Sequence, residues 1–343
     1  MSKMKFSIQP DTGTLSEQDA KRYFSTVGLG VAVLMVLFYG CNFGLTLACA
    51  KVAPHLLDNV WAVNLLSLLP LYGIAFPVFY LILRRLPRDR VSPEKMGAGS
   101  FFGGICVALL LMMAGNYVAN MVIYAVELLT GRSLVNPVQT MTEGNAWWIN
   151  LIFMVLVAPL LEELVFRKIL CDRLLPLGEG YAVVLSAAIF GLIHGNFYQF
   201  FYAFLLGALF ALLYIKTGRI RYSVLYHGLI NLLGGVLAPW VLEKLAPLLE
   251  EETLLRMATD PMVAAELMRA NLLPLMLMML YETVLMGGSV LGVILLIRGR
   301  RRIHLAPGLL PPPKEGRVAN VFCNIGVAAA LTVFAGIFIL SLL

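Results

Sequence analysis

The chain has 343 residues, of which 60% are hydrophobic and 13% are charged, and its mean hydropathy is +0.84. This composition excludes an ordinary soluble domain, in which about a quarter of the residues are charged. The net charge of +6 does not indicate a nucleic-acid partner, because the basic residues lie in short loops between apolar segments. We therefore expect an all-α, polytopic integral membrane protein whose helices pack as a bundle in the lipid bilayer.

The apolar segments predict about nine transmembrane helices. Residues 1–26 are polar and lack the apolar core of a cleavable signal peptide, so the first helix is expected to be a retained anchor. The fifth and sixth segments are short and almost continuous, which predicts a tight helical hairpin or a partly re-entrant pair. The nine segments are 27–49, 60–83, 101–126, 147–166, 181–196, 198–215, 222–242, 272–297 and 320–342.

The distribution of basic residues predicts the orientation. An N-terminus in the cytoplasm places 21 of the 26 Lys and Arg residues inside, as cytoplasmic loops prefer. The acidic loop 243–271 then faces outside, where we expect a short amphipathic helix, and the proline-rich linker 306–313 lies inside. The basic residues left outside are Lys51, Arg132, Lys244, Arg256 and Arg269.

Three ionisable residues lie near the end of the fourth apolar segment: Glu162, Glu163 and Arg167. An ionised side chain at the centre of a membrane helix costs about 2.5–3.5 kcal/mol even on the lower scales, so such residues are usually functional. Residues four apart share a helix face, which predicts an ion pair between Glu163 and Arg167. Glu162 is rotated away from that pair and is expected to point into a cavity as a base or a ligand. The alternative is that all three are interfacial groups in contact with water or lipid headgroups.

Polar residues also occur in the segments that follow. His227 and Asn231 stand four apart and can project the same way, as donors to a developing oxyanion would. His194 lies at the end of the fifth segment. Each histidine alone is more typical of a buried ring bonded to a backbone carbonyl, but three clusters on neighbouring segments favour one shared site.

The three clusters match, in order, the EExxxR, FxxxH and HxxxN motifs of the CPBP family. This family, also called Abi, comprises CAAX-prenyl-protease-like and bacteriocin-processing intramembrane proteases, and residues 147–242 of the chain resemble its catalytic core. Residues 1–26 are then a tail, 27–130 the N-terminal helices, 243–271 a loop and 272–343 the C-terminal helices. The motifs read Glu162-Glu163-x-x-x-Arg167, Phe190-x-x-x-His194 and His227-x-x-x-Asn231.

The resemblance implies a membrane endopeptidase of a prokaryotic cell membrane that hydrolyses a peptide bond of a membrane-associated peptide or protein. Glu162 resembles the general base that activates water, and His194 resembles the residue that helps to bind that water. His227 and Asn231 resemble the groups that stabilise the tetrahedral intermediate. Glu163 and Arg167 resemble residues that support these groups.

The sequence is compatible both with a site that holds a catalytic metal ion and with a site that does not. Glu162, His194 and His227 would supply the three protein ligands of a catalytic zinc ion. The chain lacks the HExxH motif in which two histidines one helical turn apart form such a site. The family resemblance is compatible with a metalloprotease and with a metal-free glutamate mechanism, and we favour no tightly held zinc.

Two other functions are compatible with the sequence. One is a non-proteolytic immunity or partner-binding protein on the same scaffold. The other is a secondary transporter that uses buried charges such as Glu282, in the eighth segment, as an ion relay. The oligomeric state and the identity of the substrate are not predicted.

A shared site requires the motif residues to lie at the same depth. At 1.5 Å per residue, Glu162 lies about 22 Å from Trp147 and His194 lies about 20 Å from Tyr181. Straight helices would therefore place them at different depths. We expect either a fifth helix that starts below the interface or a shallow hairpin, with the motif residues within hydrogen-bond or one-water distance.

Overall fold

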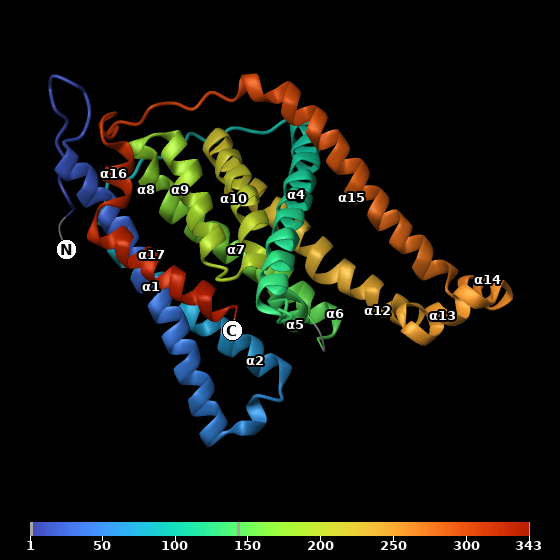
Figure 1. The fold of residues 1–343 in the computed structure, drawn as a ribbon. Helices are drawn as coiled ribbons and strands as arrows, with labels where there is room; N and C mark the ends of the chain where they lie inside the picture. The colour runs from blue at the N-terminus through green and yellow to red at the C-terminus, as the bar shows by residue number, and fades with distance from the viewer. Residues whose placement is uncertain (1–2, 143–144, 343) are drawn as a thin grey trace.

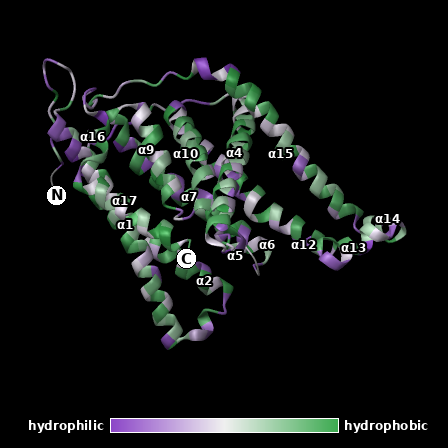
Figure 2. Cartoon of the chain, in the orientation of Figure 1, coloured by the Kyte–Doolittle hydropathy of each residue, from purple (hydrophilic) through white to green (hydrophobic). Residues whose placement is uncertain are grey.

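The protein is a bundle of helices in the computed structural model, which describes residues 3–142 and 145–342 (Figure 1). Within those residues no β-strand occurs, and two isolated bridges are the only β-type pairings. Apolar residues predominate along the long helices and polar residues gather in several of the connections (Figure 2). The all-α, polytopic fold is confirmed.

The N-terminal part of the chain supplies the elements that lie before the polar motifs. They are α1 (Glu17–Val52), η1 (Pro54–Leu56), α2 (Val60–Leu68), η2 (Leu69–Ala75), α3 (Phe76–Leu83), α4 (Ala98–Thr130) and α5 (Pro137–Thr142). Ser16 begins α1 by accepting a hydrogen bond from the Asp19 backbone N–H, as N-cap residues do. Thus α1 starts inside the segment 1–26 that was expected to be a polar tail.

The central part of the chain holds all of the motif residues. Its elements are α6 (Trp147–Asn150), η3 (Leu151–Val157), α7 (Ala158–Glu163), η4 (Leu164–Cys171), α8 (Asp172–Leu174), η5 (Leu175–Leu177), α9 (Glu179–Leu192), α10 (Phe197–Thr217), α11 (Ile220–Leu232), η6 (Leu233–Leu237) and α12 (Ala238–Leu249). The first six of these elements form one continuous helical run from Trp147 to Leu177.

The C-terminal part of the chain leads from α12 back to α1. It contains α13 (Glu251–Thr259), α14 (Pro261–Ala270), α15 (Leu272–Gly299), η7 (Arg300–Arg302), α16 (Arg317–Phe322) and α17 (Ile325–Leu340). The region 243–271, expected to be a loop with one short helix, is instead mostly helical, because α12 extends into it and α13 and α14 follow. The helix α17 lies along α1, so the two ends of the chain pack together (Figure 1).

Seven helices of the described chain are long and apolar enough to cross a membrane. The fifth expected segment is short, as predicted, because α9 has 14 residues. The sixth was also predicted to be short, which is wrong: α10 has 21 residues and reaches the length of a span. The ninth is divided, because a break at Cys323–Asn324 separates α16 from the 16 residues of α17.

The basic loops gather at one end of the bundle, which we call the basic end. Backbone hydrogen bonds join Asp89 to Asp172 and Glu94 to Thr217, so the loop before α4 is tied to the ends of two later helices. The linker between η7 and α16 also lies there, since the Leu310 N–H donates to the Pro176 carbonyl over 2.7 Å (Figure 1). Loops far apart in sequence therefore share one face, as the predicted topology requires.

Candidate active site

A helical hairpin brings the first two motifs to the same depth. The fourth apolar segment was expected to end at residue 166, but its helical run continues to Leu177 and turns at Gly178. Glu162 lies sixteen residues before Gly178 and His194 lies sixteen residues after it. Gly178 has φ +125°, a conformation that favours glycine, and the chain reverses there into α9. The depth conflict is resolved by the low start of α9, one of the two expected arrangements.

The predicted pairing between Glu163 and Arg167 is present. The Arg167 Nε donates to Glu163 Oε2 over 2.8 Å and both side chains are 0% exposed. A second guanidinium nitrogen donates to Ser186 Oγ over 2.7 Å, and the guanidinium carbon lies 5.4 Å from the centre of the Phe190 ring. Burial of both charges is costly unless they are paired and hydrogen-bonded, and here each has several partners. The pair therefore joins η4 to α9 inside the bundle.

His227 connects this buried pair to Glu162. Its Nδ1 lies 3.2 Å from Glu163 Oε1, and a carboxylate paired with Arg167 only accepts, so Nδ1 carries a proton. Its Nε2 faces Glu162, 3.9 Å from Oε2. The ring stacks on Phe210 with the centres 5.5 Å apart, which fixes its plane. The third motif is thus in contact with both glutamates of the first.

His194 occupies the turn that follows α9. Its Nδ1 lies 2.7 Å from the Phe190 carbonyl, which only accepts, so Nε2 is the acceptor nitrogen of the neutral ring. The turn requires Gly195, whose φ is +68°, and Asn196 then begins α10 by accepting from the Gln199 N–H.

The two histidines lie on either side of one phenylalanine. The Phe190 ring contacts His194 at 5.2 Å and His227 at 5.5 Å between ring centres, both edge to face. His194 also lies within electrostatic range of Glu162 and His227, although no direct hydrogen bond joins His194 to Glu162 in the described chain. The first, second and third motifs therefore meet in one cluster around Phe190.

Asn231 makes a contact that the sequence did not suggest. Its Nδ2 donates to the Met154 carbonyl over 2.8 Å. Met154 lies in η3, where backbone bonds run from residue i to i−5, and the residue that would bond to it is Pro159, which has no N–H. The amide of Asn231 supplies the missing donor and docks α11 against the fourth span. One amide hydrogen of Asn231 remains available, because an NH₂ group has two.

Glu162 is the least enclosed of the acidic groups in this cluster. Its side chain is 19% exposed, and the Tyr72 hydroxyl donates to its Oε1 over 3.3 Å. Tyr72, on η2, also lines an apolar groove of about 530 Å³ together with residues of α2 and of the fourth span, among them Val157 and Leu161. Sequence reasoning missed Tyr72, because a single tyrosine in an apolar span carries no motif.

The donor set does not form a ready zinc site. Glu162 and His227 approach each other, but no group of three or more His, Cys, Asp or Glu side chains in residues 3–142 and 145–342 is arranged to hold a metal ion. The His194 Nδ1 is bonded to a carbonyl, as in many metal-binding histidines, yet its ring does not complete a set with the other two.

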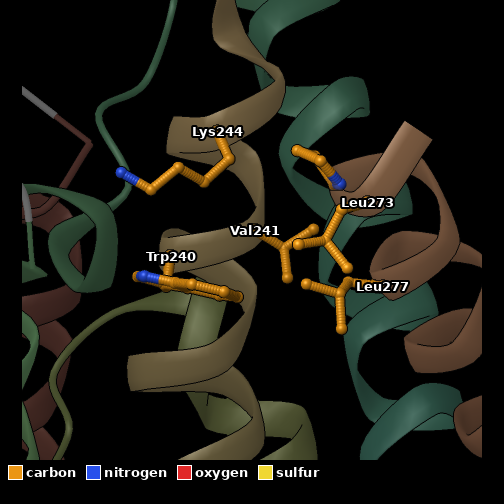
Figure 3. A pocket seen from close by; sticks show the side chains of 6 residues that line it. Trp240, Val241, Lys244, Leu273 and Leu277 are labelled. Carbon is orange, nitrogen blue, oxygen red and sulfur yellow. The ribbon is translucent and has the colours of Figure 1, made fainter. Parts of the chain in front are cut away.

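Other candidate positions lie apart from the cluster. A cavity of about 220 Å³ separates α12 from α15, and Val241, Leu273 and Leu277 point toward one another in it (Figure 3). Its lining contains one charged residue, Lys244, which pairs with Glu243 over 3.2 Å. Glu282 lies on α15, beside Tyr281, and forms no hydrogen bond or ion pair with the motif residues in the described part of the chain. Neither the cavity between α12 and α15 nor Glu282 provides a second pair of groups that could act as acid and base.

Comparisons with known proteins match the part of the chain that contains these residues. Residues 144–233, which contain all six predicted site residues, match the model of the type II CAAX prenyl endopeptidase Rce1-like family. A putative membrane peptidase, YdiL of Bacillus subtilis (strain 168), is 27% identical over 156 residues, which are 45% of this chain and 64% of the relative. The membrane-embedded CAAX protease MroQ of Staphylococcus aureus (strain USA300) is 33% identical over 90 residues, 24% of this chain and 36% of the relative.

The similarity is concentrated in the part of the chain that builds the cluster. The chain spans less than two thirds of the length of either relative, and no solved structure matches it. The family model begins just before the fourth span and ends just after Asn231, so α1 to α5 and α12 to α17 lie outside it. The segment 144–233, which holds the three motifs, is therefore similar to the type II CAAX prenyl endopeptidase Rce1-like family.

Proposed function

We propose that the protein is an intramembrane endopeptidase that hydrolyses a peptide bond of a membrane-associated peptide or protein with water activated by Glu162. The observation that carries the proposal is the difference between the two neighbouring carboxylates. Glu163 is fully buried and bonded to Arg167 and His227, whereas Glu162 is partly exposed and forms no ion pair with Lys or Arg among the described residues. Glu162 is therefore the carboxylate that a water molecule can reach.

His227 supplies the donor to the oxyanion in this proposal. Its ring lies between the two carboxylates, with Nδ1 3.2 Å from Glu163 Oε1 and Nε2 3.9 Å from Glu162 Oε2. When both ring nitrogens carry a proton, Nδ1–H donates to Glu163 and Nε2–H points toward the space beside Glu162. A donor in that position stabilises the oxyanion of a tetrahedral intermediate, which is often worth about 10²–10³ in kcat.

The proton transfers follow from these positions. Glu162 takes a proton from a water molecule that His194 Nε2 also binds, and the resulting hydroxide attacks the carbonyl carbon of the substrate. His227 Nε2–H and the second amide hydrogen of Asn231 bind the oxyanion. When the C–N bond breaks, Glu162 returns its proton to the leaving amine, so the enzyme ends in its starting state.

The substrate is proposed only as a class. The relatives are named a membrane peptidase and a CAAX protease, and both come from bacteria. A CAAX-type tail and a peptide or bacteriocin precursor are both compatible with a site that opens beside an apolar groove. The proposed location is a bacterial cell membrane.

The test compares Glu162→Gln with Glu282→Gln, which alters a membrane carboxylate away from the cluster. Membranes that hold each variant are analysed by mass spectrometry for peptides that appear only with the wild-type protein. Loss of a general base reduces the rate by about 10²–10⁴, so products should disappear with Glu162→Gln and persist with Glu282→Gln. Equal products from wild type and Glu162→Gln would refute the proposal. A chelator added to the purified wild-type protein tests zinc separately.

A further inference from the structure

The N-terminal helices contribute one polar side chain to the cluster, although they lie outside the family match. The Tyr72 hydroxyl is 3.3 Å from Glu162 Oε1, across a separation of ninety residues. The matched region begins at residue 144, so this contact joins Glu162 to a part of the chain that the family model does not cover.

The surroundings of Tyr72 hold its ring in one orientation. Its ring meets Phe76 edge to face with centres 5.2 Å apart, and Phe76 meets Phe166 at 6.4 Å. Phe166 meets Phe190, the ring between the two histidines, at 5.0 Å. A row of aromatic rings thus runs from Tyr72 through Phe76, Phe166 and Phe190 to the two histidines. Phe76 and Phe166 are almost fully buried, so the row has little freedom to move.

The helix around Tyr72 departs from regular α-helical geometry. Tyr72 lies in η2, a π-helical segment that begins next to Pro70 and ends before Pro77. Prolines remove backbone donors, and π-helical turns occur often at functional sites. The same segment packs against α1, so the position of Tyr72 is set by the N-terminal helices.

The two oxygens of Glu162 then have different tasks. Tyr72 binds Oε1, while Oε2 faces His227 Nε2. The terminal torsion of a glutamate is broad, so without a partner on one oxygen the carboxylate rotates freely. A bond of 3.3 Å is longer than the usual 2.5–3.0 Å for a hydroxyl donor, and catalytic hydrogen bonds often shorten only when the substrate is bound.

We infer that Tyr72 is a positioning residue, which donates to Glu162 Oε1 so that Oε2 is held as the base beside His227. This inference rests on the proposed function and extends it, because it makes the N-terminal helices part of the active site. A hydrogen bond to a charged group that is lost on truncation typically changes a rate by about 10- to 100-fold. The effect should fall on kcat, since the hydroxyl acts on the base and not on the bound substrate.

The experiment uses Tyr72→Phe, which keeps the ring and removes the hydroxyl, in the full-length protein. The control is Tyr281→Phe, because the Tyr281 hydroxyl also donates over 3.3 Å, to the Leu233 carbonyl, away from Glu162. The substrate is a synthetic peptide that spans a cleavage site identified through its dependence on Glu162. We expect kcat to fall about 10- to 100-fold with Tyr72→Phe, with KM and the thermal unfolding temperature unchanged. Tyr281→Phe should retain the wild-type kcat.

The outcomes separate this inference from the proposed function. If Glu162→Gln abolishes cleavage and Tyr72→Phe retains the wild-type kcat, the inference is wrong and the endopeptidase proposal stands. If Tyr72→Phe raises KM and leaves kcat unchanged, Tyr72 contacts the substrate through the apolar groove, which also overturns the positioning role. If Glu162→Gln leaves cleavage intact, the proposed function itself fails.

Discussion

The buried pair of Glu163 and Arg167 allows a quantitative prediction about stability. Replacement of Arg167 by Met would leave the Glu163 carboxylate fully buried, with His227 as its remaining partner among the described residues. Removal of one member of a buried ion pair typically costs about 3–5 kcal/mol, because the other charge stays in a low-dielectric interior. Glu163→Leu should cost a similar amount, since it leaves the guanidinium of Arg167 buried.

The double variant should cost much less than the sum of the two. With both charges gone, no unpaired ion is buried, and apolar replacement of a buried pair is often neutral or stabilising. Two losses remain. His227 Nδ1 loses its acceptor, which costs about 1–3 kcal/mol, while Ser186 keeps the Phe166 carbonyl 3.4 Å away. We therefore expect the double variant to lose about 1–3 kcal/mol, against about 6–10 kcal/mol for additive single effects.

The measurement is the free energy of unfolding in mixed detergent micelles, followed by the fluorescence of the four tryptophans. Arg167→Lys is a milder third variant, because it keeps the charge and loses the planar fork that bonds Glu163. Should the two single effects simply add in the double variant, the two charges would not be coupled. The interpretation of Glu163 and Arg167 as a structural brace would then be wrong.

Two further predictions concern Asn231 and the orientation. Asn231→Leu should lower the free energy of unfolding by about 1–3 kcal/mol, because the Met154 carbonyl loses its donor; unchanged stability would show that this contact does not dock α11. With the native cysteines replaced, a membrane-impermeant maleimide should label Thr259→Cys in intact cells and His304→Cys only after permeabilisation, because His304 lies at the basic end. Labelling of His304→Cys in intact cells would reverse the predicted orientation.

Local sequence patterns predicted the helices well wherever a long apolar run was bounded by polar residues. Such a run has to satisfy its backbone within one helix, so its position follows from composition alone. The same reasoning failed at Arg167 to Leu177, where the sequence looks like the end of a span and the helix continues to Gly178. Burial of Arg167 and Arg173 by other helices makes that extension possible, and no local pattern reports such burial.

For the candidate site, spacing predicted the pairing of Glu163 with Arg167 and separated Glu162 from it. Residues four apart are neighbours on any helix, so this result needed no tertiary information. The bond from Asn231 to the Met154 carbonyl could have been suspected only from Pro159, which removes a backbone donor one turn later. The contact of Tyr72 with Glu162 carried no comparable signal.

The sequence by itself therefore determined that this is a helical membrane protein and which six residues form its motifs. Hydropathy and i, i+4 spacing are properties of neighbouring residues, so they can be read from the sequence without the fold. Only the tertiary structure decided their depth, through the turn at Gly178, and their partners, through the packing of η2 and α11 against the fourth span. Contacts between residues far apart in the chain depend on how whole helices pack, and this is why Glu162 acquires Tyr72 only in the folded molecule.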